Sequence, residues 1–150
     1  MKTLIKLSKI VLIVLFFSGQ VQAQNKIKNK LPAYKKHHIV MQLTSNDKAV
    51  HKGLIKQLNN LKNGWGDSVE IEVVCHGPGI DFMHKERTGF KEDIYKLKER
   101  GIVFIVCENS LKEREVPKED ILPDMQYVLM GIGEIVLKQE QGWTYIKAGF

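Results

Sequence analysis

Apolar runs and amphipathic segments alternate along the chain from about residue 38 to its end. The clearest run is residues 102–106, where five apolar residues follow one another between Gly101 and Cys107. An unbroken apolar run bounded by a glycine and by polar residues is typical of a strand buried on both faces of a parallel sheet. We therefore predict a central strand that ends at Cys107.

Four more strands are predicted from short apolar or alternating runs, and the segments between them have a helical period. The clearest helix has apolar residues spaced by three and four, after a cluster of capping residues at 44–47. Predicted strands cover residues 38–43, 69–75, 125–130 and 143–147, and predicted helices cover about 50–61, 90–100 and 131–137, with a helical turn at 111–115. This alternation predicts an α/β fold, a three-layer α/β/α sandwich around a mostly parallel five-stranded sheet.

The first 23 residues follow a different pattern, that of a secretory signal peptide. Lys2, Lys6 and Lys9 precede an apolar run at 10–17, and small residues lead to Ala23. The apolar run is shorter than the roughly 20 residues that span a bilayer, so we expect no stable membrane insertion. The sequence therefore predicts an exported protein, periplasmic or secreted after cleavage near Ala23. Its parts are a signal peptide (1–23), a basic linker (24–36) and one folded domain (37–150).

The positive net charge of +6 arises in the N-terminal part of the chain. From residue 37 onward the chain has 15 basic and 17 acidic residues, so the folded domain is slightly acidic. Nucleic-acid-binding domains have a basic folded surface. We therefore expect no nucleic-acid partner, and we interpret the lysine-rich linker as a solvated tail.

The two cysteines, Cys75 and Cys107, both end predicted strands, and reactive groups of open α/β sheets lie at the carboxyl ends of strands. The common doubly wound orders place the first strand between the second and third. The two thiols would then be about 9–10 Å apart, beyond the roughly 7 Å that a disulfide allows between Cα atoms. We expect two free thiols that could face the same crevice.

Short motifs in this order resemble the DsrE/DsrF-like family of sulfur-handling proteins, over about residues 38–147. They are HGPGI (76–80), VCENSL (106–111), LP (122–123), GIGEI (131–135) and QGWTYI (141–146). The resemblance implies a flavodoxin-like α/β/α fold and an oligomeric assembly. It also implies, in active members, a strand-end cysteine that carries sulfur as a persulfide, and Cys107 lies where that cysteine would be.

Cys107 is accordingly the candidate sulfur carrier. Polar residues that follow it can cap the next turn and leave backbone N–H groups facing the thiol, which would favour the reactive thiolate. We therefore predict that Cys107 is more reactive than Cys75. The candidate binding residues, from this segment and from the turn after the second strand, are Cys75, His76, Gly77, Asn109 and Ser110.

No metal site or cofactor is predicted. The five histidines and two cysteines show neither CxxC nor HxxxH spacing. The chain also has no Walker loop, no GxGxxG motif and no Ser-His-Asp signature. Trp65, Trp143 and Tyr145 are interpreted as packing or interface residues.

The sequence is compatible with two functions, and it does not decide whether the protein is an enzyme. The first is an exported protein that binds or relays sulfur through a Cys107 persulfide, with a sulfur-donor or acceptor protein as partner. The alternative is a non-catalytic, oligomeric binding or structural module with the same fold. Both interpretations expect a homo-oligomer.

Overall fold

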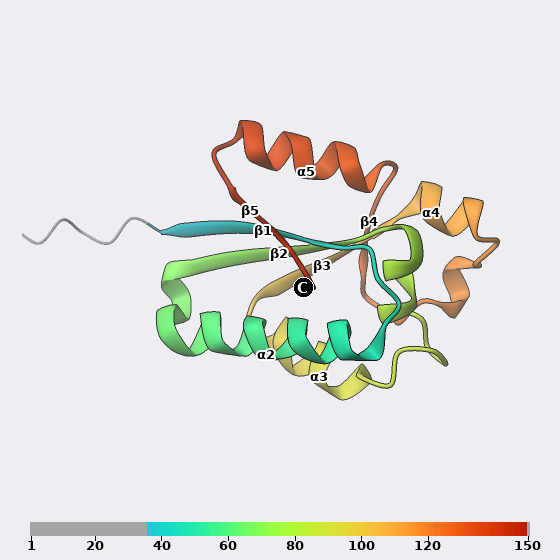
Figure 1. Ribbon diagram of the computed structural model, residues 1–150, viewed down its shortest axis with the longest axis horizontal. Coiled ribbons are helices and arrows are strands. Elements are labelled where there is room, and N and C mark those ends of the chain that lie inside the picture. The colour runs from blue at the N-terminus through green and yellow to red at the C-terminus, as the bar shows by residue number, and fades with distance from the viewer. Residues whose placement is uncertain (1–35, 150) are drawn as a thin grey trace, which may run out of the picture. The chain divides into compact units, whose positions relative to one another are not determined.

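A computed structural model describes residues 36–149, and in it five parallel strands form one sheet (Figure 1). The strand order is β4-β3-β2-β1-β5. The strands are β1 (His37–Leu43), β2 (Val69–Cys75), β3 (Ile102–Cys107), β4 (Gln126–Val128) and β5 (Thr144–Lys147). All four neighbouring pairs are parallel. The predicted α/β class with a five-stranded parallel sheet is therefore confirmed.

The strand order differs from the order assumed in the sequence analysis. The second strand, β2, lies between β1 and β3, so the first strand does not separate the two cysteine-bearing strands. The register pairs Cys75 with Val106, one residue before Cys107. The prediction that the cysteines lie two strand spacings apart is wrong, because they lie on neighbouring strands. Strand order depends on long-range pairing that a local pattern does not contain.

Helices cover both faces of the sheet. In Figure 1, α2 (Lys48–Trp65) and α3 (Lys91–Glu99) lie on one face, and α5 (Gly131–Glu140) lies on the other. The short helix α4 (Glu108–Glu113) begins directly after β3, three residues earlier than the predicted turn. Three short 3-10 segments complete the described elements: Gly66–Ser68, Gly77–Phe82 and Lys118–Asp120.

Local signals account for the start and the end of α2. The Asp47 side chain accepts a hydrogen bond from the Ala49 N–H at 2.7 Å, as an N-cap does. The helix runs a few residues past its predicted end and stops at Gly66, whose φ of 53° is left-handed. A glycine adopts that conformation without the steric cost that a Cβ atom brings.

The core has two parts because side chains alternate between the faces of the sheet. The larger part lies on the face covered by α2 and α3, and it includes Cys75. The smaller part lies under α5, where Val40, Val74 and Ile105 of three neighbouring strands pack with Ile135 of the helix. Successive residues at the carboxyl end of each strand therefore face the two helix layers in turn.

A buried ion pair connects α5 to the middle of the sheet. The Lys138 Nζ is 2.7 Å from a carboxylate oxygen of Glu72 on β2, which is 4% exposed. Burial raises the pKa of Glu72, although Lys138 acts in the opposite direction. Lys138 also lies over the Trp143 ring. Removing one partner of such a pair leaves a buried charge, so the pair adds a polar contact between α5 and β2 to the apolar packing of Ile135.

The predicted signal peptide, its cleavage site near Ala23 and the basic linker up to residue 35 lie outside the described residues. Across residues 36–149, no helix is both long enough and apolar enough to cross a bilayer.

Candidate functional site

Cys107 is the last residue of β3 and lies where two helices begin. Its Sγ accepts a hydrogen bond of 3.2 Å from the backbone N–H of Gly131, the first residue of α5. The thiol can donate to the carbonyl of Leu129, 3.8 Å away. Helix α4 starts at the next residue, Glu108, so its first N–H groups also lie beside the sulfur. The carboxyl end of one strand and the starts of two helices thus surround a single thiol.

These donors favour the charged form of the thiol. Burial by itself raises the pKa of Cys107, but hydrogen bonds from the Ser110 hydroxyl and from the backbone N–H groups of Gly131, Ser110 and Asn109 outweigh it. The pKa of Cys107 therefore lies below the ordinary value for a cysteine, and the thiolate is the nucleophilic form. The N–H groups that the sequence predicted to face this thiol are present, and Gly131 adds one that was not predicted.

Ser110 connects the start of α4 to the loop that follows β2. Its hydroxyl oxygen accepts a 2.8 Å hydrogen bond from the Gly77 N–H, which leaves the hydroxyl hydrogen free to donate to Cys107. The φ of Gly77 is 51°, a left-handed value that suits glycine and turns its N–H toward Ser110. The structure thus brings Gly77, Asn109 and Ser110, all named from the sequence, together around Cys107.

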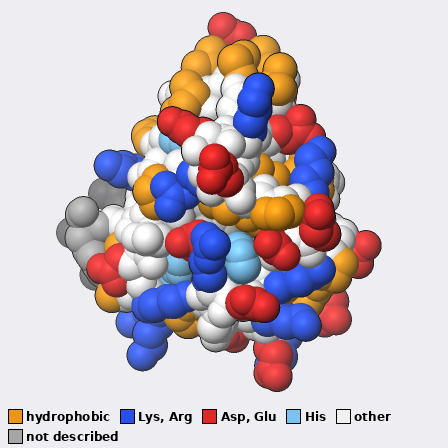
Figure 2. All heavy atoms as spheres, turned by 90° about the vertical axis from the view of Figure 1, so that its right-hand side faces the viewer, with side chains coloured by type: hydrophobic (Ala, Val, Ile, Leu, Met, Phe, Trp, Pro, Cys, Tyr) orange, Lys and Arg blue, Asp and Glu red, His pale blue; other side chains and the backbone are white. Residues whose placement is uncertain are grey.

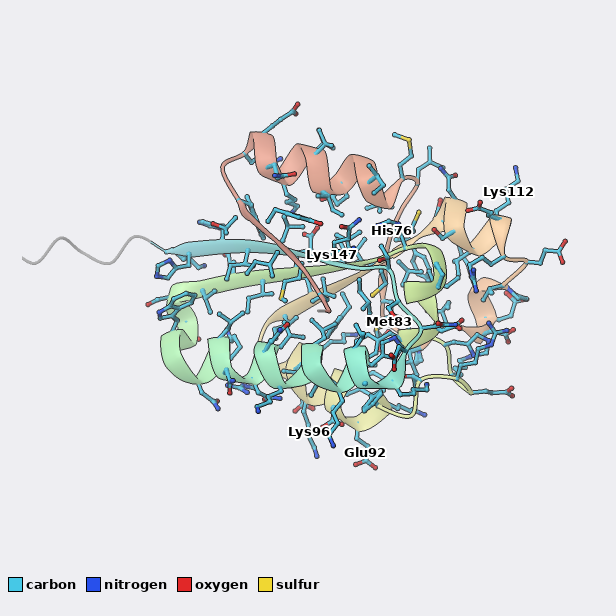
Figure 3. The ribbon with its side chains drawn as sticks, viewed as in Figure 1. His76, Met83, Glu92, Lys96, Lys112 and Lys147 are labelled. Atoms are coloured by element: carbon cyan, nitrogen blue, oxygen red, sulfur yellow. The ribbon has the colours of Figure 1, made fainter. Side chains whose placement is uncertain are left out.

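His76 lies on the same side of the sheet as Cys107, with Gly131 against both. A Cβ atom built on Gly131 would be 3.0 Å from the His76 Cβ and 3.1 Å from the Cys107 Cβ. Contacts of this length are tighter than nine in ten real Cβ contacts, so a side chain at position 131 would have to push its neighbours back, and glycine lets the start of α5 come this close without that cost. Figure 3 labels His76 at the end of the sheet where α4 and α5 begin. Burial lowers the pKa of His76, which keeps the imidazole neutral at pH 7.

Cys75, also named from the sequence, is not part of this cluster. It ends β2 but belongs to the core under α2 and α3, whereas Cys107 faces the α5 side. Cys75 is fully buried, and burial raises its pKa far above the ordinary value for a thiol. Both cysteines are free, as expected, because neighbouring strands point them to opposite faces. The expectation that both could face one crevice is wrong.

Three residues of the site were not named from the sequence: Gln42, Leu129 and Gly131. Gln42 lies on β1, and its amide nitrogen is 2.7 Å from the His76 Nε2. Leu129 lies between β4 and α5 and Gly131 begins α5, in a segment predicted as the end of a strand and a glycine hinge. A glycine at the first position of an amphipathic helix is a weak signal for close approach. A polar residue inside an otherwise apolar strand is a second weak signal, which Gln42 provides.

Cys107 is almost completely covered, whereas the segment around Gly131 carries exposed apolar side chains. The cysteine is 5% exposed, and Leu129, Met130 and Ile132 are 64%, 56% and 54% exposed. Figure 2 shows hydrophobic side chains gathered at the top of the molecule, over α5. Among residues 36–149, no group of three or more His, Cys, Asp or Glu side chains is arranged to hold a metal ion. The chemistry that this arrangement supports is that of one activated thiol.

Comparisons with known proteins agree with this fold. A solved structure of MTH1491, a protein of unknown function from Methanobacterium thermoautotrophicum, is 29% identical with a TM-score of 0.70. The match covers 74% of this chain and 98% of that one. BT1422, a conserved protein of unknown function from Bacteroides thetaiotaomicron, is 19% identical with a TM-score of 0.59, over 73% of this chain and 93% of that one, and shows the fold alone.

No curated protein matches the chain. The scan of protein families, in contrast, matches the DsrE/DsrF-like family over residues 35–148, which is the domain that carries Cys107 and the residues around it. The chain therefore belongs to the DsrE/DsrF-like family.

Proposed function

We propose that this protein is an exported sulfur carrier that binds sulfane sulfur on Cys107 as a persulfide. The observation that carries the proposal is the environment of the Cys107 sulfur, with hydrogen-bond donors from the starts of α4 and α5 that lower the thiol pKa. Membership in a family of sulfur-handling proteins supports the same chemistry. The partner is a protein that donates or accepts the sulfur atom.

The proposed step is a sulfur exchange between two thiols. The Cys107 thiolate attacks the outer sulfur of a donor persulfide, R–S–SH. A new S–S bond forms on Cys107, the S–S bond of the donor breaks, and the donor leaves as the thiolate R–S⁻. The proton on the transferred sulfur passes to water, and the product is Cys107–S–S⁻. The exchange consumes no oxidant or reductant, because the sulfane sulfur only changes its carrier.

Mass spectrometry of the purified protein tests this proposal. After incubation with glutathione persulfide and removal of the excess, the peptide that contains Cys107 should gain the mass of one sulfur atom. Cys107→Ser should abolish the gain, and Cys75→Ser is the matched control that should retain it. A wild-type protein that gains no sulfur contradicts the proposal.

One observation favours the alternative, a non-catalytic binding or structural module. Cys107 is only 5% exposed, which is typical of a cysteine used as a small core residue. The two functions differ in the reaction with iodoacetamide at pH 7. A carrier should be alkylated at Cys107 in the folded state, whereas a module should be labelled slowly and equally at both cysteines.

Self-assembly is the second part of the proposal. Large exposed hydrophobic residues are concentrated on α5 and the loop before it: Leu129, Met130, Ile132, Val136 and Leu137. Contiguous apolar patches of this kind are typical of interaction surfaces. We expect light scattering to show more than one subunit at micromolar concentration. The double variant Ile132→Glu, Val136→Glu should be monomeric, and a wild-type monomer would contradict self-assembly.

Export is the third part of the proposal, and it depends on the pattern of residues 1–23. N-terminal sequencing of the exported protein should begin near Gln24. Placing charges in the apolar run, with Leu12→Arg and Leu15→Arg, should leave Met1 in place on a protein that is not exported. A wild-type protein that keeps Met1 would contradict export.

A further inference from the structure

Three polar side chains near Cys107, those of His76, Gln42 and Tyr145, form a chain of hydrogen bonds. The His76 Nε2 is 2.7 Å from the amide nitrogen of Gln42 on β1. The hydroxyl of Tyr145 on β5 donates to the amide oxygen of the same Gln42. Three neighbouring strands, β2, β1 and β5, thus contribute one residue each.

Strand register places all three side chains on the α5 face. Gln42 is paired with Val74, two residues before His76, and Tyr145 is paired with Val40, two residues before Gln42. Side chains two residues apart on a strand share a face, and Val40 and Val74 pack under α5. The chain of hydrogen bonds therefore runs across the sheet on the face where Cys107 lies.

The direction of these hydrogen bonds decides where the imidazole carries its proton. Tyr145 donates to the amide oxygen, so the amide nitrogen of Gln42 is turned toward His76. An amide nitrogen only donates, so the Nε2 atom must accept and carries no hydrogen. Burial lowers the pKa of His76, which keeps the ring neutral. A neutral imidazole with a bare Nε2 has its proton on Nδ1.

The Nδ1–H group lies at the end of the ring that is attached to Cβ, and the Cβ atoms of His76 and Cys107 are close to each other. The Cβ atoms of His76 and Cys107 are both within 3.1 Å of one point above Gly131. Nδ1 is bonded to the ring carbon that is attached to Cβ, whereas Nε2 is at the far end of the ring, toward Gln42. Among the described residues, the hydrogen bonds of this ring's nitrogens involve only Nε2. The Nδ1–H is therefore a neutral donor that has no hydrogen-bond partner among residues 36–149, on a residue whose Cβ is close to that of Cys107.

We propose that Gln42 and Tyr145 are positioning residues that hold His76 as the Nδ1–H tautomer, so that His76 donates a hydrogen bond to the sulfur carried on Cys107. The inference rests on the proposed function, because its acceptor is the terminal sulfur of Cys107–S–S⁻. A hydrogen bond to that anion stabilises the loaded state. His76 does not act as the base that deprotonates Cys107, since Nε2 is occupied and Nδ1 already has its proton.

The tautomer can be measured directly on the wild-type full chain with ¹⁵N-labelled histidine. At pH 7 the NMR spectrum of His76 should show a protonated Nδ1 and an unprotonated Nε2. Gln42→Leu and Tyr145→Phe should shift the ring toward the other tautomer, because each removes a link in the chain. Tyr95→Phe, on α3 at the opposite face, is the control and should change nothing. A wild-type ring with protonated Nε2 would overturn the proposal.

The donor role is tested by the lifetime of the persulfide. After loading with glutathione persulfide, His76→Leu should lose the sulfur about tenfold faster than wild type, the effect of one hydrogen bond to a charged group. In His76→Asn the side-chain amide nitrogen takes the place of Nδ1, so the lifetime should return to within about twofold of wild type. If the persulfide of His76→Asn is as short-lived as that of His76→Leu, or if the persulfide of His76→Leu lasts as long as that of wild type, the donor role is overturned.

The pH dependence separates a donor from a base. In wild type and in His76→Asn, the rate of Cys107 alkylation should follow only the ionisation of the thiol. If the wild-type rate shows a second ionisation that is absent in His76→Asn, then His76 acts as a base and the inference is overturned. A wild-type chain that takes up no sulfur contradicts the proposed function, whereas one that loads normally with the wrong tautomer contradicts this inference alone.

Discussion

The two cysteines end neighbouring parallel strands and yet lie in opposite environments. Cys75 belongs to the main hydrophobic core, and burial there raises its pKa. Cys107 lies on the other face, where donors from Ser110, Asn109 and Gly131 lower its pKa. Both residues are nearly inaccessible, so exposure does not distinguish them. The difference is that helix starts supply N–H groups to one sulfur and apolar side chains surround the other.

This comparison shows that the position at a strand end is not sufficient to activate a thiol. Helix α4 begins directly after Cys107, while a 3-10 segment follows Cys75 after His76. The N–H groups at the start of a helix have no partner within it and are free to point at an anion. The activated thiol is the one whose own strand leads straight into a helix and whose other side is closed by the start of a second helix.

The largest expected effect is a difference in alkylation between the two thiols. At pH 7 iodoacetamide should label Cys107 at least about 100-fold faster than Cys75, because the lowered pKa leaves far more of Cys107 as the reactive thiolate. Peptide mass spectrometry after timed quenching measures both rates in one sample. In denaturant the two rates should become similar. Similar rates in the folded protein would remove the distinction between the two sites.

Glycine 131 offers a second test, because the approach of α5 to Cys107 depends on its missing Cβ. Gly131→Ala should lower the free energy of unfolding by about 1–3 kcal/mol, as overpacking does, and should slow the alkylation of Cys107. Urea unfolding and alkylation rates measure the two effects. Gly133→Ala is the matched control in the same helix.

The control is informative because of what its added methyl group would meet. A Cβ on Gly133 contacts only side-chain atoms of Met130, which is exposed and can move. Gly133→Ala should therefore be neutral or stabilise the helix by about 0.5–1 kcal/mol. If both variants lost equal stability, the close approach at Gly131 would not be specific to the site.

Ser110 tests the contribution of a single donor. Ser110→Ala removes the hydroxyl that donates to Cys107, so the pKa of that thiol should rise and alkylation at pH 7 should slow by about tenfold. The rate measured against pH should then reach its plateau at a higher pH. Ser68→Ala, in the exposed turn before β2, is the control. An unchanged profile in Ser110→Ala would assign the lowered pKa to the backbone donors alone.

The smallest expected effect is on alkaline stability, where the two thiols should act in opposite directions. The pKa of Cys75 is higher in the folded chain than the ordinary value of 9.0, so its contribution to stability is present below pH 9 and lost above it. The pKa of Cys107 is lowered, so its contribution is present above pH 9 and lost as the pH falls. Each contribution is about 1 kcal/mol or less at pH 9.5.

Urea unfolding at pH 7.5 and 9.5 measures these contributions. The loss of stability between the two pH values should be smaller in Cys75→Ala than in wild type and larger in Cys107→Ala. The same sign of change in both variants would contradict the assigned pKa shifts.

The local sequence was sufficient to predict most of the elements. The apolar run at 102–106 predicted β3, and residues 69–75 were predicted as a strand with the bounds that β2 has. The capping residues before α2 predicted its start, and Asp47 is the cap. These features depend on side-chain period, capping and turn residues, which act over a few positions of the chain. The α/β class follows from the order of such elements.

Less could be predicted where an element is held by distant contacts. The predicted strand at 125–130 is reduced to Gln126–Val128, because Leu129 and Met130 leave the sheet to lead into α5. Helix α4 begins at Glu108 instead of at 111. Both differences occur beside Cys107, where the Asn109 N–H donates to the Leu129 carbonyl at 3.2 Å, a contact between residues far apart in the chain.

The amino-acid sequence by itself determined which residues end the strands and which of them carry thiols, hydroxyls and an imidazole. Only the tertiary structure decided which of these side chains meet. The strand order and the one-residue offset between Cys75 and Cys107 place the two thiols on opposite faces, and a shift of one residue in register would reverse that. Gln42, Tyr145 and Gly131 join the site only because β1, β5 and α5 converge on it. Such convergence depends on contacts between residues far apart in the chain, so no local pattern specifies it.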